Sequence, residues 1–145
     1  MAKYIKALVI MVLLTSFQEP AKLTWKIMEA IEFEEKYNKD VAGKMLFPKW
    51  PPHIKKLEGQ RVTVSGYVIP MDNKGEIIAL SANPYDACFF CGKAGPASIM
   101  AVELEKKNNK YVVDEYVSFT GWLKLNDSDI NQFYYILEHA VPVKK

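Results

Sequence analysis

Residues 61–70 read RVTVSGYVIP, and this stretch decides the fold. Val62 and Val64 alternate with polar residues, as in a strand with one buried face, and we expect Val64 to lie in the core. Gly66 interrupts the pattern, and a glycine inside a strand permits the bend or bulge that a curved sheet needs. Pro70 ends the run. The stretch therefore predicts a bent β-strand.

Four more strand patterns follow toward the C-terminus, separated by turn-forming sequences. They span residues 76–81, 98–105, 111–125 and 133–143. Gly121 again lies inside a strand, and we expect its neighbour Trp122 to be buried like Val64. Five strands, two with an internal glycine, predict a small sheet that closes on itself. We therefore predict a mainly β protein with a five-stranded OB-like barrel over residues 59–145; an open sandwich is the alternative.

Residues 19–58 are predicted to form a short, partly helical N-terminal extension to this barrel. Apolar residues recur at helical spacing over 23–30 and alternate over 31–37, which predicts a short helix and then a strand. We expect residues 38–52 to be irregular, because the prolines in this stretch force extended backbone on the residues before them. One helical turn is expected to start at the last proline pair.

The first 18 residues, MAKYIKALVIMVLLTSFQ, have the layout of a secretory signal peptide. Lys3 and Lys6 precede an unbroken apolar run from Ala7 to Leu14, and small polar residues follow it. This run is too short to span a bilayer as a helix. A buried N-terminal helix is the alternative. We therefore expect an exported mature protein, periplasmic or secreted, with no membrane span.

The charge balance argues against a nucleic-acid partner. The chain has 19 basic and 17 acidic residues, and without the first 18 residues the two numbers are 17 and 17. Arg61 is the single arginine, although proteins that read phosphates and base edges depend on the arginine fork. A neutral mature chain with one arginine favours a protein or a small ligand of the cell envelope as its partner.

The motif CFFC at residues 88–91 is the one constellation with chemistry. In an oxidising compartment the favoured interpretation is a disulfide between Cys88 and Cys91 that fixes the surrounding loop. A bridge that closes so short a loop contributes only about 2 kcal/mol. The residues expected to shape this loop are Gly92, Gly95 and Pro96.

Two alternatives stay open for the cysteine pair. A divalent metal such as zinc would use both thiolates, but a closed zinc site needs four ligands and the chain has no second cysteine pair. The other candidate ligands are Asp86, His53 and His139. Active thiol redox chemistry is disfavoured, because no helix is predicted after Cys91 to lower a thiol pKa.

Several strings also resemble a known family. These are GYVIPMD at 66–72, LSANP at 80–84, CFFCGKAGPAS at 88–98 and GWLKLND at 121–127. Together they resemble an uncharacterised family of exported bacterial domains, a domain of unknown function, over roughly residues 50–141. The resemblance implies an envelope or secreted location and a small β domain, and it implies no catalysed reaction. Some relatives carry a histidine in the cysteine loop, where this chain has Phe89 and Phe90.

No hydrolase, metalloprotease or nucleotide-binding motif is found. The aromatic residues Trp50, Trp122, Tyr134 and Tyr135 form either an exposed ligand-binding face or, as we favour, core and rim packing. We therefore predict a non-catalytic exported binding or assembly module whose Cys88/Cys91 loop is disulfide-bonded or metal-stabilised. The alternative is an envelope thiol–disulfide redox protein that uses the same two cysteines.

Overall fold

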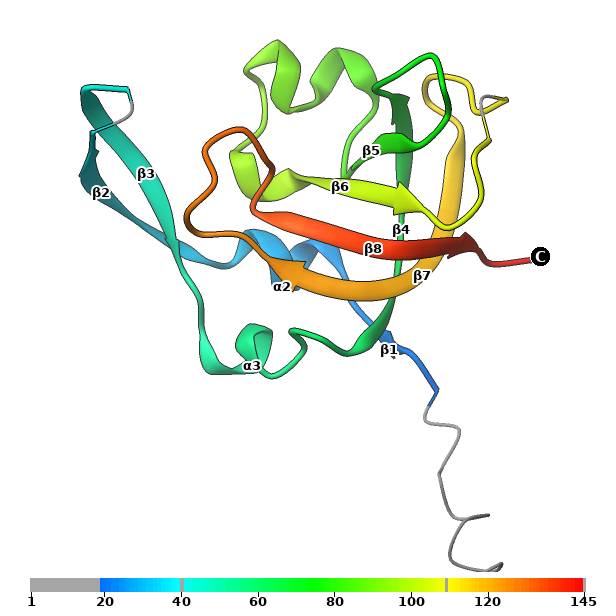
Figure 1. Cartoon of the computed structure of the whole chain (residues 1–145), viewed down its shortest axis with the longest axis horizontal. Helices are drawn as coiled ribbons and strands as arrows, with labels where there is room; N and C mark the ends of the chain where they lie inside the picture. Colours follow the sequence, from blue (N-terminus) through cyan, green and yellow to red (C-terminus); the bar gives the residue numbers. More distant parts are fainter. Residues whose placement is uncertain (1–18, 40, 109, 145) are drawn as a thin grey trace, which may run out of the picture.

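The computed structural model describes residues 19–39, 41–108 and 110–144, and the predicted signal peptide lies outside them. Five strands form the body of the molecule: β4 (Arg61–Pro70), β5 (Ile77–Ser81), β6 (Ile99–Leu104), β7 (Tyr116–Leu125) and β8 (Tyr135–Pro142). They are hydrogen-bonded in the order β4-β5-β6-β8-β7, and β7 pairs back to β4 (Figure 1). The sheet is therefore closed, which confirms the predicted five-stranded barrel.

The neighbouring strands of this barrel are not all antiparallel. The third barrel strand, β6, runs parallel to the fifth, β8, and the other neighbours are antiparallel. Val64 is buried in the core as predicted. The expectation for Trp122 is wrong: its side chain is 45% exposed on the outer wall, because it alternates with Leu123, which faces the core.

The two glycines inside strands lie where a neighbouring backbone comes very close. A Cβ on Gly66 would lie 2.6 Å from the carbonyl oxygen of Ser81, and one on Gly121 would lie 2.6 Å from that of Glu138. Opposite Gly121, β8 carries an extra residue, and His139 takes a φ of 50° there. Both glycines therefore allow two strands to approach more closely than any side chain permits.

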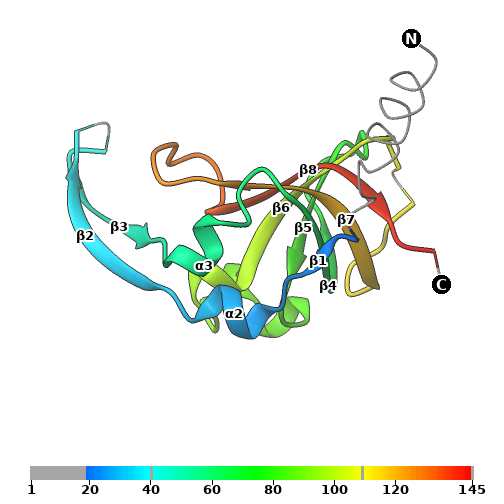
Figure 2. The same ribbon diagram turned by 90° about the horizontal axis from the view of Figure 1, so that it is seen from below.

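The N-terminal region adds five elements: β1 (Ala21–Lys22), α2 (Trp25–Glu29), β2 (Glu32–Asn38), β3 (Gly43–Lys49) and α3 (Pro52–Lys55). The strands β2 and β3 form an antiparallel hairpin that projects from the barrel (Figures 1 and 2). The expectation of an irregular stretch is wrong over β3. This strand pairs with β2 along its whole length, and Pro48 is tolerated because β3 is an edge strand.

The helix α2 packs against the barrel core. The indole Nε1 of Trp25 donates a hydrogen bond to the carbonyl oxygen of Ser65 at 2.8 Å. The buried hydroxyl of Tyr135 donates one to the carbonyl oxygen of Met28, also at 2.8 Å. Met28 is fully buried in the same hydrophobic cluster as the inward-facing barrel residues. The part of the extension around α2 therefore belongs to the barrel's core.

The segment between β6 and β7 contains no helix in its described part. β7 starts at Tyr116, later than the expected residue 111, because Asp114 takes a φ of 67° and the amide of Glu115 turns back to the carbonyl of Val112. Every helix in the described ranges is short, and none has the length and apolarity of a membrane span.

Candidate functional site

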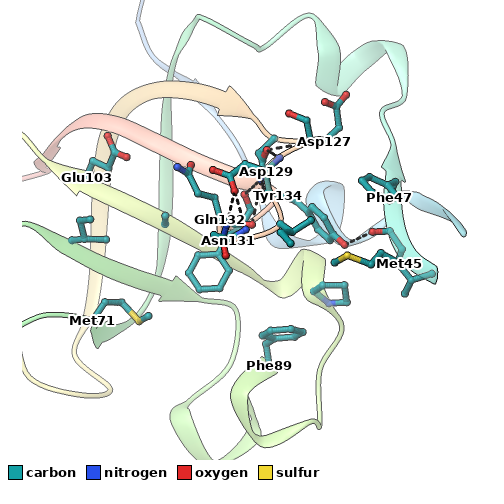
Figure 3. Close-up of a pocket in the computed structure, with 18 of the residues that line it drawn as sticks. Met45, Phe47, Met71, Phe89, Glu103, Asp127, Asp129, Asn131, Gln132 and Tyr134 are labelled. Atoms are coloured by element: carbon teal, nitrogen blue, oxygen red, sulfur yellow. Dashed lines mark hydrogen bonds between the residues drawn. The ribbon is translucent and has the colours of Figure 1, made fainter. Parts of the chain in front are cut away.

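A cleft of about 550 Å³ lies against the outer face of β5 and β6 (Figure 3). Its floor includes Ile77, Ala101 and Glu103, which alternate with the core-facing residues of these two strands. Four other segments surround it: the turn after β4, the cysteine loop, the β7–β8 loop and β3. Its volume is in the range of ligand pockets in proteins.

One buried amide organises the β7–β8 loop. The Nδ2 group of Asn126 donates to the carbonyl oxygens of Asp129 at 2.7 Å, Phe133 at 3.2 Å and Gln132 at 3.3 Å. Its Oδ1 accepts from the amides of Asp129 at 2.9 Å and Ser128 at 3.3 Å. Asn126 therefore holds the whole loop in one conformation, and residues 126–134 all line the cleft.

The turn after β4 is held by a carboxylate. Asp72 accepts hydrogen bonds from the backbone amides of residues 74–77, at distances of 2.6 to 3.2 Å. Partial desolvation raises the pKa of this carboxyl, but the four N–H groups outweigh it and bring the pKa below its ordinary value. The turn places the exposed apolar side chain of Met71 at the rim of the cleft, beside Ile77 of β5.

The cysteine loop packs onto the outside of the barrel. It folds as three short 3₁₀ turns, η1 (Tyr85–Ala87), η2 (Phe89–Cys91) and η3 (Pro96–Ser98). Cys88 is fully buried in a small cluster with Ile69, Ala79 and Ile99, and Phe89 and Phe133 pack against this cluster. The cluster lies outside the main core. It fixes the loop beside the cleft, so that Phe89 and Pro96 form one wall.

The two cysteines have different environments. Cys91 is exposed and donates its S–H to the carbonyl oxygen of Tyr85 at 3.1 Å, whereas Cys88 is buried, and both thiols are free. The disulfide and the metal therefore remain predictions. The residues predicted to shape the loop are at its bends. Gly92 ends η2 with a φ of 70°, Gly95 is extended and accepts two hydrogen bonds from Ser98, and Pro96 opens η3.

The other predicted ligand residues lie on three different elements. His53 lies in α3, Asp86 in η1 and His139 on the outer wall of β8. Within the described ranges, no three histidine, cysteine, aspartate or glutamate residues are placed so that they could share one metal ion. His139 instead borders a separate hollow of about 380 Å³, together with Arg61, Glu105, Trp122 and Val141.

The hairpin forms the remaining wall of the cleft. Met45, Leu46 and Phe47 of β3 line it, and the hydroxyl of Tyr134 donates a hydrogen bond to the carbonyl oxygen of Leu46 at 2.6 Å. Figure 3 shows Tyr134 between the hairpin and the β7–β8 loop. The side chain of Tyr134 therefore ties two segments that are far apart in the sequence.

The four aromatic residues considered together in the sequence have three different roles. Tyr135 belongs to the core, and Trp50 packs edge-on against it with ring centroids 5.2 Å apart. Trp122 lies on the outer wall, and Tyr134 lines the cleft. The predicted core and rim packing accounts for Tyr135 and Trp50. The four aromatic residues form no single ligand-binding face.

Sequence reasoning missed the residues that build the cleft. The string NDSD at 126–129 predicts a turn, and the structure has one, but the burial of Asn126 is not visible in the pattern. Met45, Leu46 and Phe47 lie in a stretch expected to be irregular. The one available signal was their apolar character beside a proline, which is weak evidence for a binding wall.

The fold has a solved counterpart. A crystal structure of a DUF3299 family protein from Pseudomonas aeruginosa PAO1 is similar to this chain, with a TM-score of 0.54 and 14% sequence identity. The match covers 88% of this chain and 99% of that protein. At this identity the likeness shows a shared fold. The chain therefore has the fold of a bacterial domain of unknown function, in line with the kind of family that its sequence resembles.

No family model and no curated protein matches the chain.

Proposed function

We propose that this protein is an exported, non-catalytic binding module of the cell envelope, and that its ligand or partner occupies the cleft on β5 and β6. The position of the cleft carries this proposal. OB barrels bind their ligands on the face of their second and third strands, between the loop that joins strands one and two and the loop that joins strands four and five. Here those elements are β5, β6, the Asp72 turn and the Asn126 loop.

The chemistry of the lining supports recognition. More than half of the lining residues are apolar or aromatic, and the others carry amide, hydroxyl or carboxylate groups. Such a surface excludes water from an apolar ligand and orients it with a few polar contacts. The Asp72 turn and the Asn126 loop are each fixed by internal hydrogen bonds, so that little order has to be created on binding.

The cysteine loop contributes a rigid wall to this site. The proposal includes a disulfide between Cys88 and Cys91 after export, with a zinc ion shared by the two thiolates as the alternative. Free-thiol counting and elemental analysis of protein purified from the periplasm distinguish these states. If the purified protein reduces a disulfide substrate and Cys88→Ser abolishes that turnover, the redox alternative replaces the binding module.

Binding in the cleft can be tested with Nile red, an uncharged apolar dye, and amide chemical shifts. We expect the dye to shift amides of the Asn126 loop and of β3. Leu46→Asp places a charge on an exposed cleft residue and should reduce dye affinity by about tenfold or more. Val143→Asp is the matched control, since Val143 is equally exposed but lies outside the cleft. Equal dye affinity in both variants would overturn the proposed site.

Export is tested separately by mass spectrometry of the mature protein. The proposal expects an N-terminus between Ser16 and Lys22, where small residues follow the apolar run. A chain that keeps Met1 and stays in the cytoplasmic fraction would contradict the envelope location.

A further inference from the structure

We infer that the cleft selects an extended peptide segment in which basic side chains alternate with apolar ones, presented by a partner protein. This inference rests on the proposed function, because it names the ligand class of the same site. Three features of the cleft carry it: its charge, its apolar lining and the free edge of β3.

The charge of the lining is of one sign. Its charged side chains are those of Asp72, Glu103, Asp127 and Asp129, and no lysine, arginine or histidine is among the described residues that line it. The chain beyond residue 18 has equal numbers of basic and acidic residues, so the cleft is more negative than the chain as a whole. A cleft lined by one sign of charge attracts the opposite sign. An anionic partner is therefore disfavoured.

Two of these carboxylates are available to a ligand. Asp72 and Asp129 already accept hydrogen bonds from backbone amides of their own loops. Asp127 and Glu103 have no hydrogen-bond or ion-pair partner among the described residues. Lys124 is near enough to interact electrostatically with Glu103 and Asp129, but its ammonium group is bonded to Glu138 at 2.9 Å. Asp127 and Glu103 are thus the groups expected to pair with a basic side chain of the peptide.

The apolar lining can accommodate several side chains of a peptide better than one rigid ligand. Met45 and Met71 lie at two ends of the cleft in Figure 3, with Phe47 and Phe89 on its walls. Methionine side chains are flexible and polarizable, and they adapt to different apolar groups. Several side chains of a peptide can therefore share this surface.

The β3 strand offers backbone partners for a peptide. β3 pairs with β2 on one edge, and the structure shows no strand on its other edge among the described residues. The carbonyl oxygen of Leu46 already accepts the hydroxyl of Tyr134, so a peptide would pair with the remaining groups of this strand. Three consecutive residues of β3, Met45, Leu46 and Phe47, line the cleft, although alternate residues of a strand point to opposite faces. The strand therefore meets the cleft edge-on. An extended segment can pair with such an edge while its side chains enter the cleft.

The test measures binding of three short capped peptides of equal length by calorimetry. All three alternate leucine with a second residue, which is lysine, glutamine or glutamate. We expect the lysine peptide to bind about tenfold more tightly than the glutamine peptide at low ionic strength. The glutamate peptide should not bind, and about 0.5 M salt should remove most of the lysine preference. A glutamine or glutamate peptide that binds as well as the lysine peptide overturns the inference.

Variants locate the effect. The double substitution Asp127→Asn and Glu103→Gln should abolish the preference for lysine over glutamine and leave thermal stability unchanged. The matched control is Glu29→Gln with Glu58→Gln, two exposed acids outside the cleft, which should preserve the preference. A preference that survives the cleft variant, or disappears in the control, contradicts the assignment.

Backbone methylation tests the pairing with β3. A lysine peptide with alternate N-methyl groups cannot donate to a strand edge, and it should bind about tenfold more weakly. Unchanged affinity would overturn the extended binding mode. Binding of Nile red distinguishes a wrong ligand class from a wrong binding site. If the dye occupies the cleft and the lysine peptide does not, the ligand class is wrong and the proposed function stands; if neither binds, both fail.

Discussion

The barrel and the β2–β3 hairpin are both β-structure, but different contacts stabilise them. Every barrel strand is paired on two edges and turns one face to a continuous core. The hairpin strands pair only with each other, and Pro48 is their one buried residue. An isolated two-stranded hairpin is only marginally stable in water. Strand formation and stability therefore have separate causes in this chain.

The hairpin depends on contacts to the β7–β8 loop and the core. The ring of Phe33 lies 5.5 Å from that of Tyr134, whose hydroxyl also binds the carbonyl oxygen of Leu46. Trp50, just after β3, packs on Tyr135 of the core. The hairpin and the loop therefore support each other across the cleft. This part of the molecule should open at a lower free energy than the barrel.

The largest expected effect contrasts two glycines. Gly121→Ala should lower the free energy of unfolding by about 1–3 kcal/mol, because the new Cβ would lie 2.6 Å from a backbone carbonyl oxygen. In the hairpin, Gly43→Ala should stay within about 0.5 kcal/mol, because its Cβ would have a single neighbour at 3.7 Å. Urea unfolding of both variants measures this difference. Similar losses in both would mean that the hairpin is packed as tightly as the barrel.

The second prediction compares the two ends of the cysteine motif under reducing conditions. Cys88→Ser should destabilise the protein by about 1–3 kcal/mol, because it places a hydroxyl in an apolar cluster that offers no described partner. Cys91→Ser should change stability by less than about 0.5 kcal/mol, because Cys91 is exposed. Thermal unfolding with and without reductant checks both values.

The same variants report on the disulfide. If the oxidised protein contains the bridge, each single substitution removes it, and under oxidising conditions the double variant should cost little more than Cys88→Ser alone. Additive losses in both conditions would exclude a bridge that contributes to stability.

A smaller effect is expected when the hairpin loses its hydrogen bond to the loop. Tyr134→Phe should cost about 1 kcal/mol or less in global stability, as one partly exposed hydrogen bond is lost. Hydrogen exchange of the β3 amides should nevertheless become faster, while exchange of the β4 amides stays unchanged. Tyr37→Phe is the control, since Tyr37 is an exposed hairpin residue outside the cleft. Uniform acceleration in both elements would show that hairpin and barrel open together.

The smallest effect is the pH dependence of the Asp72 turn. The pKa of Asp72 is lower in the folded protein than its ordinary value of 3.8, so its contribution is complete above that value. It is lost as pH falls through the lower, folded pKa. An NMR titration should show the Gly75 amide shifting in that acidic range, and Asp72→Asn should abolish the shift. A Gly75 transition above pH 3.8 in the wild-type protein would contradict this assignment.

Much of the barrel can be predicted from sequence, because a strand with one buried face records its environment in its own alternation. Residues 61–70 predict β4 with its buried Val64, and Gly66 and Gly121 predict the curvature. The exposure of Trp122 could not be predicted from its size. It depends on the register of β7, in which the neighbouring Leu123 takes the inward position.

The candidate site is much less visible in the sequence. The cysteine loop stood out because its residue types are rare, and its position beside a cleft is a product of the fold. Asn126 stood out less, since an asparagine in a polar turn is common, and its role comes from burial under its own loop. The β3 strand was missed, because Pro48 signals a break in local sequence and edge pairing with β2 overrides it.

The β class of the protein, the number of barrel strands and the two glycines inside strands can be read from the sequence alone. These properties follow from alternation and from glycine and proline, which act over a few residues. The position of the cleft, its lining residues and its negative charge depend on the tertiary structure. The cleft joins segments between residues 45 and 134 that meet only when the barrel closes. No local pattern encodes that meeting, because it results from strand order and packing.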